Sequence, residues 1–170
     1  DAVLLVLGGS DADLDWKRFI VSRGRRVQSN TPLHRFADNL RSLIRMITMS
    51  GAAPVLSDVP NQDVLARGAW LGQHIGQNLM PWIEAGGGQA ESDRRLAEYN
   101  QIVEDVSAET RVDVARWAKG ISTLPLADRF GPDATHPSAP AHRIIARVVE
   151  QSIRSVAAQL PPRRRIVAEA

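Results

Sequence analysis

The hydrophobic positions of the chain fall into two kinds of run, and their alternation predicts an α/β fold. A continuous apolar run at residues 3–7 is typical of a parallel strand that is buried on both faces, and residues 53–60 are interpreted as a second buried strand. Between them, apolar residues recur at helical spacing over residues 31–51, where Pro32 suits the first turn and Gly51 the end of a helix. A strand, a helix and a strand in this order predict a right-handed βαβ unit with parallel strands.

The remaining segments predict further helices and one short strand. A single helical stripe of apolar residues runs through the segment that follows the second strand, and two more amphipathic segments lie closer to the C-terminus. The expected elements are a loop or short helix at 14–31, a helix within 61–88, a helix at 92–110, a short third strand at 112–115, a loop at 118–132 and a long helix at 139–160.

The pattern predicts one domain with an insertion. We expect residues 1–160 to form the domain, residues 61–90 a helical insertion and residues 161–170 a basic tail. The insertion follows the carboxyl end of a strand, where open α/β sheets bind ligands. It is therefore interpreted either as a lid or wall of an acyl or sugar pocket, with Trp70, His74 and Trp82 as pocket residues, or as a helix that only packs on the body.

Composition narrows the function classes. The 170 residues carry 21 Lys and Arg against 19 Asp and Glu, a net charge of +2 that gives no reason to expect nucleic-acid binding. The absence of Cys excludes disulfides and thiolate chemistry, and the histidines lack the spacing of metal ligands. No apolar run approaches the ~20 residues of a membrane span. The compartment stays open: residues 1–170 contain no signal peptide, and a periplasmic or secreted location would require a leader that precedes Asp1.

The stretch Pro-Asp-Ala-Thr-His-Pro at 132–137 carries the clearest chemical signal. Asp133 precedes His136 by three residues, a spacing that lets a carboxylate hold an imidazole in one orientation. Such a pair supplies two of the three members of a serine-hydrolase triad. Asp-x-x-His also arises by chance, where the Asp caps a turn and the His is solvated, so the interpretation depends on the rest of the chain.

A second signal follows the first predicted strand. Gly8 and Gly9 precede Ser10 and Asp11 at the carboxyl end of the apolar run. Glycines at this position let the backbone turn sharply and approach a ligand at the edge where open α/β sheets bind them. The simpler alternative is a tight turn with a Ser or Asp helix cap.

Together these segments resemble the SGNH hydrolases, also called GDSL-type esterases and lipases. The family's last block, Asp-x-x-His-Pro followed by a helix, is similar to residues 133–137, and its third block, an apolar strand ending in Gly-x-Asn-Asp, is similar to residues 1–12. The Asn-Leu pair at 39–40 and the Tyr-Asn pair at 99–100 also resemble family positions. The resemblance covers nearly all 170 residues and implies a flavodoxin-like three-layer α/β/α fold with a parallel sheet, without the family's N-terminal strands.

The resemblance also implies roles for individual residues. Asp133 and His136 would be the catalytic acid–base pair, and Gly8 and Ser10 would belong to the oxyanion hole, with Ser10 where the family has Asn. The family's Gly-Asp-Ser block, which carries the nucleophile, and its second block are not found in these residues. In an alternative alignment with the family, which we call the rival register, residues 8–11 are a degenerate first block and Ser10 itself is the nucleophile. The helix and strand that come after residues 1–12 are those expected after the family's third block, so they favour the alignment with that block.

Three functions follow, in order of preference. The first is a serine ester hydrolase of the acyl or acetyl esterase or lipase type, without a cofactor, acting on a small-molecule or glycan ester. A partner segment would then supply the missing N-terminal strands. The second is a non-catalytic SGNH-like domain that binds a glycan or an acylated partner. The third is an unrelated doubly wound domain that binds phosphate or a nucleotide at residues 8–10.

Overall fold

The computed structural model describes residues 1–160, so the predicted basic tail at 161–170 lies outside the described residues. The described part contains a parallel sheet of three strands in the order β1-β2-β3, which confirms the predicted parallel arrangement. The elements in chain order are β1 (Ala2–Leu5), α1 (Gly9–Ala12), α2 (Trp16–Val21), α3 (Leu33–Met49), β2 (Ala53–Ser57), α4 (Val64–Ile75), α5 (Met80–Ala85), α6 (Gly88–Thr110), β3 (Val114–Ala115), α7 (Trp117–Ile121), α8 (Leu126–Arg129) and α9 (Ala139–Gln159).

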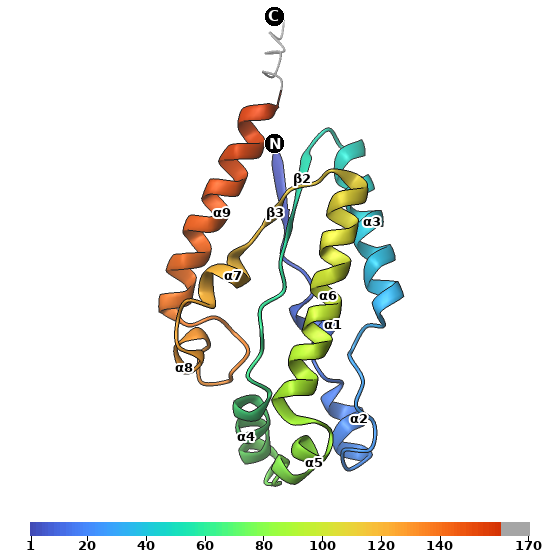
Figure 1. The fold of residues 1–170 in the computed structure, drawn as a ribbon, viewed down its shortest axis with the longest axis vertical. Helices are drawn as coiled ribbons and strands as arrows, with labels where there is room; N and C mark the ends of the chain where they lie inside the picture. Colours follow the sequence, from blue (N-terminus) through green and yellow to red (C-terminus); the bar gives the residue numbers. More distant parts are fainter. Residues whose placement is uncertain (161–170) are drawn as a thin grey trace, which may run out of the picture.

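Helices cover both faces of the sheet. Helix α9 packs on one face and α3 and α6 lie on the other, which gives three layers (Figure 1). Successive residues of β2 face opposite layers: Leu56 packs with Phe36 and Tyr99, whereas Val55 packs with Val156 of α9. Burial on both faces of β2 explains why this strand appears in the sequence as a mostly apolar run.

A second apolar cluster builds the end of the molecule that lies away from the start of β1 and the end of α9. It joins α2 to α4 and α5 through Phe19, Val64, Leu79 and Ile83 (Figure 1). The single helix expected within 61–88 is wrong, because α4 ends at Gly76, which adopts a left-handed conformation with φ 67°, and α5 begins at Met80. Helix α6 begins at Gly88, and Gly86 and Gly87 separate it from α5.

The loop expected at 118–132 is also wrong, because α7 and α8 interrupt it. The buried carboxylate of Asp58, just after β2, accepts hydrogen bonds from the backbone N–H groups of Ala118 (2.7 Å) and Lys119 (3.0 Å). These bonds cap the first turn of α7 from a position far away in the sequence. Local sequence patterns therefore could not reveal this helix.

Asn100 of α6 holds the chain in place as it leaves the sheet. Its side-chain oxygen accepts the N–H of Val59 at 2.8 Å, and its amide nitrogen donates to the Val59 carbonyl at 2.9 Å. Val59 is buried, so neither backbone group can turn to water instead.

Replacement of Asn100 by alanine should leave this buried backbone pair unsatisfied. We expect a loss of about 2 kcal/mol in the free energy of unfolding, measured by urea denaturation, because each unpaired buried group costs about 1–3 kcal/mol and water can enter part of the space. The neighbouring Gln101→Ala on the exposed side of α6 is the matched control and should change stability little. If both substitutions lowered the free energy of unfolding equally, the two hydrogen bonds between Asn100 and Val59 would not contribute to stability.

Among residues 1–160, no helix is both long and apolar enough to cross a lipid bilayer.

Candidate functional site

Asp133 and His136 form a hydrogen-bonded pair in the loop before α9. The ring Nδ1 of His136 lies 2.6 Å from Oδ2 of Asp133. The other carboxylate oxygen, Oδ1, accepts the backbone N–H groups of Thr135 and His136, each at 3.1 Å. With one oxygen fixed by the backbone, the second is held toward the imidazole. This arrangement sets the orientation of the ring and favours the tautomer with a proton on Nδ1.

The local backbone explains how the sequence presents this pair. The N–H of Gly131 donates to the carbonyl of His136 at 2.7 Å, which closes the loop on itself. Ala134 lies inside it with φ 55°, a left-handed conformation. Immediately after the loop, the hydroxyl of Ser138 accepts the N–H of Ala141 and caps α9. The pair is therefore attached to the start of a long helix that packs on the sheet.

The two side chains differ in exposure and charge. Burial opposes ionisation of Asp133, but the backbone hydrogen bonds from His136 and Thr135, together with the His136 ring, outweigh it and lower the pKa of Asp133 below 3.8. The His136 side chain is 84% exposed, whereas that of Asp133 is 21% exposed. Within residues 1–160 the ring's Nε2 makes no hydrogen bond. An ionised carboxylate thus orients an imidazole whose second nitrogen faces outward.

The lowered pKa of Asp133 has a consequence for stability. A carboxyl whose pKa is lower in the folded than in the unfolded state stabilises the fold above its unfolded pKa, and this contribution disappears as the pH falls through its folded pKa. Asp133→Asn should therefore be less stable than the unchanged protein at neutral pH. The difference should shrink below about pH 4, measured as free energy of unfolding across a pH series. If the difference in free energy of unfolding between the two proteins did not change with pH, Asp133 would not be an ionised partner of His136.

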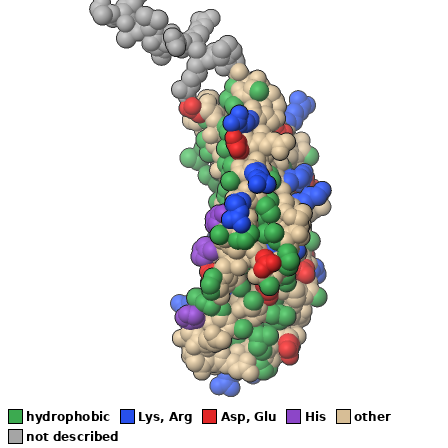
Figure 2. Space-filling view, turned by 90° about the vertical axis from the view of Figure 1, so that its left-hand side faces the viewer, with side chains coloured by type: hydrophobic (Ala, Val, Ile, Leu, Met, Phe, Trp, Pro, Cys, Tyr) green, Lys and Arg blue, Asp and Glu red, His purple; other side chains and the backbone are tan. Residues whose placement is uncertain are grey.

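Arg67 connects α4 to this pair. Its guanidinium donates to the carbonyl oxygen of Asp133 at 3.2 Å and lies 4.8 Å from the ring centre of Trp70. Trp70 in turn stacks on His74, with ring centres 3.9 Å apart, and the His74 Nδ1 lies 2.7 Å from the Trp70 carbonyl. The predicted pocket residues Trp70 and His74 are thus linked to Asp133. Figure 2 shows histidine side chains along one edge of the face that carries α9 and α4.

Trp82, the third predicted pocket residue, has no such link within the described residues. It belongs to the cluster of α2, α4 and α5, and its main chain lies close to Gly24. Arg67 was missed by sequence reasoning. The signal was present, however, because Arg67, Trp70 and His74 recur at helical spacing on one face of α4.

Arg67→Met tests the connection between α4 and the Asp133 loop. The substitution keeps most of the aliphatic stem but removes a charge-assisted hydrogen bond and the contact with Trp70. We expect a loss of about 1–2 kcal/mol in the free energy of unfolding. Arg147→Met on the exposed side of α9 removes the same charge and should have almost no effect. Similar losses in the two variants would mean that the Arg67 contacts carry no stability.

The loop after β1 holds the other predicted site residues. Gly8 lies at φ 104°, and its N–H donates to Oδ2 of Asp11 at 3.2 Å. Ser10 is exposed in α1, and its carbonyl accepts the side-chain amide of Asn30 at 2.9 Å. Gln62, which follows β2, donates to the Gly9 carbonyl at 2.8 Å. Sequence reasoning missed this bond, which ties the loops at the ends of β1 and β2 together.

The Gly8–Asp11 turn and the Asp133–His136 pair are not joined directly. Within residues 1–160 no hydrogen bond links Ser10 to His136. Both segments instead contact the chain that leaves β2, the first through Gln62 and the second through Arg67.

Comparison with known proteins supports the fold. No protein-family model matches the chain. No curated protein matches its sequence. Among solved structures, the fold is similar to the crystal structure of the lipase/acylhydrolase from Enterococcus faecalis, with a TM-score of 0.55 and 18% sequence identity. The match covers 96% of this chain and 63% of that enzyme's chain, so this chain spans less than two thirds of its length. The predicted α/β fold is thereby confirmed.

Proposed function

We propose that the protein is a serine ester hydrolase of the SGNH type in which Asp133 and His136 form the acid–base pair. The observation that carries the proposal is the 2.6 Å contact between Nδ1 of His136 and a carboxylate whose other oxygen is fixed by two backbone N–H groups. In the proposed reaction Nε2 of His136 takes the proton of a serine hydroxyl as the oxygen attacks the ester carbonyl. It then gives this proton to the leaving alcohol. A water molecule then attacks the acylated serine, with His136 again taking the proton and returning it to the serine oxygen, and the acyl group is released.

The nucleophile is proposed to come from a segment outside these 170 residues that joins the sheet beside β1. Strand β1 is an edge strand in the described part of the chain, pairing with β2 alone. Val3, Val6 and Leu7, on or just after it, are 38%, 55% and 37% exposed. An apolar edge of this kind is normally covered, because it invites uncontrolled strand pairing. A further parallel strand would cover it and end at the same rim as Gly8.

Gly8 and Ser10 are the proposed oxyanion donors. The Gly8 N–H now donates to Asp11, so that carboxylate would have to turn away when negative charge develops on the substrate. The exposed hydroxyl of Ser10 could donate without such a change. Trp70 and His74 would form a wall for a small-molecule or glycan ester, and Trp82 remains a predicted pocket residue.

Hydrolysis of p-nitrophenyl acetate tests the proposal. The protein should be expressed with the coding sequence upstream of Asp1 and compared with the 170-residue chain. We expect turnover in the longer protein and none in the shorter one. Turnover by the 170-residue chain that Ser10→Ala abolishes would instead establish the rival register, in which Ser10 is the nucleophile. No turnover by either protein, together with binding of acylated sugars, would leave a non-catalytic domain.

The non-catalytic alternative has one observation in its favour. The His136 ring is largely exposed, and within residues 1–160 no hydroxyl makes a hydrogen bond with it. The phosphate-binding alternative is disfavoured, because the Asp11 carboxylate accepts the Gly8 N–H where an anion would have to sit and would repel it.

A further inference from the structure

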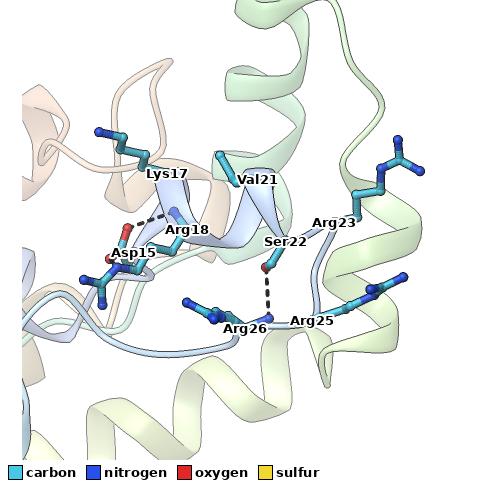
Figure 3. A pocket seen from close by; sticks show the side chains of 8 residues that line it. All are labelled: Asp15, Lys17, Arg18, Val21, Ser22, Arg23, Arg25 and Arg26. Atoms are coloured by element: carbon cyan, nitrogen blue, oxygen red, sulfur yellow. Dashed lines mark hydrogen bonds and ion pairs between the residues drawn. The ribbon is translucent and has the colours of Figure 1, made fainter.

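A hollow lined by cationic side chains lies on α2 and the turn that follows it. Its volume is about 950 Å³, and Figure 3 shows the side chains that line it. We call this surface the basic hollow. Its lining residues are Asp15, Lys17, Arg18, Val21, Ser22, Arg23, Arg25 and Arg26.

The basic hollow carries much more positive charge than the rest of the chain. Residues 15–26 carry five cationic side chains and one carboxylate, a net charge of +4. Since the whole chain carries +2, all remaining residues together sum to −2. Among the described residues the hollow contains one ion pair, between Arg18 and Asp15 at 3.3 Å. Four cations therefore face solvent with no carboxylate partner in the described part of the chain, a concentration of charge that attracts anions.

Backbone hydrogen bonds hold the turn that presents these side chains. The N–H of Gly24 donates to the Phe19 carbonyl at 2.8 Å, and the N–H of Arg26 donates to the hydroxyl of Ser22 at 3.1 Å (Figure 3). Gly24 also lies so close to Trp82 that a Cβ there would be 2.7 Å from the Trp82 Cβ. The turn is therefore packed on α5, and the arginines extend from a fixed backbone.

We infer that the basic hollow docks the protein on a membrane surface that carries anionic phospholipid headgroups. The cationic side chains point in different directions rather than toward one point (Figure 3), which suits an extended array of phosphates better than a single small anion. Val21, in their midst, is 80% exposed and can enter the acyl boundary. The hollow lies at the end of the molecule away from the start of β1 and the end of α9 (Figure 1), where a flat surface can approach it. Docking of this kind does not depend on the proposed esterase activity.

Nucleic acid fits this surface less well. Proteins that bind single strands stack the bases on exposed aromatic rings. Here Phe19, the aromatic residue at the centre of α2, is 1% exposed, and the hollow offers an aliphatic side chain instead. The residues that line the hollow include no aromatic ring on which a base could stack, whereas Val21 can insert between headgroups.

Co-sedimentation with lipid vesicles tests the inference on the 170-residue chain. Vesicles of phosphatidylcholine mixed with an equal part of phosphatidylglycerol should bind the protein, and vesicles of phosphatidylcholine alone should not. Binding should weaken as sodium chloride is raised. Arg25→Gln combined with Arg26→Gln should lower the partition coefficient about 30-fold, since each cation near an anionic surface contributes about 1 kcal/mol. Both side chains are exposed, and the turn uses only their backbone atoms.

Matched variants distinguish vesicle binding through the basic hollow from attraction of vesicles to any cationic surface of the protein. Arg143→Gln with Arg147→Gln removes the same charge from the exposed side of α9 and should leave binding nearly unchanged. Val21→Ser should weaken vesicle binding about fivefold without a change of charge. Equal losses in both double variants, or equal binding to neutral vesicles, would overturn the inference. So would stronger binding to a single-stranded oligonucleotide with no effect of Val21→Ser, which would indicate a soluble polyanion as the partner.

Discussion

Replacement of His136 by alanine is expected to lower the rate of ester hydrolysis about 10⁴-fold in the protein that carries the upstream segment. The reason is that the imidazole both takes the proton of the attacking hydroxyl and returns it to the leaving alcohol, so its loss affects each step. Asp133→Asn should cost nearly as much, because an amide cannot hold the same tautomer of the ring. Steady-state hydrolysis of p-nitrophenyl acetate gives the comparison.

His142 supplies the matched control for this prediction. It is an exposed histidine in the first part of α9, close in sequence to His136, and its side chain has no partner among the described residues. His142→Ala should retain full activity. Thermal unfolding of all three variants should show folded proteins, so that loss of activity reflects chemistry. Activity that survives His136→Ala would refute the assignment of the acid–base pair.

Gly8→Ala is expected to lower the free energy of unfolding by about 3–4 kcal/mol, through backbone strain and a steric overlap together. Gly8 has φ 104°, a conformation that strains any L side chain by about 1–3 kcal/mol. A Cβ there would also lie 2.4 Å from Cγ2 of Val59 and 3.3 Å from Cζ of Phe36, both in the main core. Relieving such an overlap in a packed core costs a further 1–3 kcal/mol or so. Chemical denaturation measures the combined loss.

Gly9→Ala, one residue along, tests whether this effect is specific. A Cβ at Gly9 meets no atom within 4 Å, and no positive φ is present there. In helix α1 alanine is the better residue, so Gly9→Ala should be neutral or stabilise the protein by a few tenths of a kcal/mol. Similar losses for Gly8→Ala and Gly9→Ala would show that the close approach of Gly8 to Val59 is not maintained in solution.

The sequence predicted the elements whose signals are local. The apolar runs of β1 and β2 and the periodicity of α3 and α9 are patterns that each segment shows by itself. It did not predict α7, because the group that caps this helix, Asp58, lies about sixty residues earlier. The break between α4 and α5 was missed for a related reason. Their apolar residues keep one stripe across Gly76, although the chain turns there.

The candidate site was predictable only in part. The hydrogen bond between Asp133 and His136 agrees with the expectation from their spacing, because the two residues share one short loop. The bond from Arg67 to the Asp133 carbonyl and that from Gln62 to the Gly9 carbonyl join segments separated by more than fifty residues. Such contacts depend on how α4 and the chain before it pack on the rest of the molecule, which a single sequence does not reveal.

Covalent labelling of the longer protein with a fluorophosphonate, followed by mass spectrometry of the labelled peptide, is the sharpest test of the proposed acid–base pair. These reagents phosphonylate a serine that a neighbouring imidazole has activated. We predict one labelled serine in the segment upstream of Asp1, with labelling lost in His136→Ala and retained in His142→Ala. A label on Ser10, or labelling that persists without the His136 ring, would contradict the assignment.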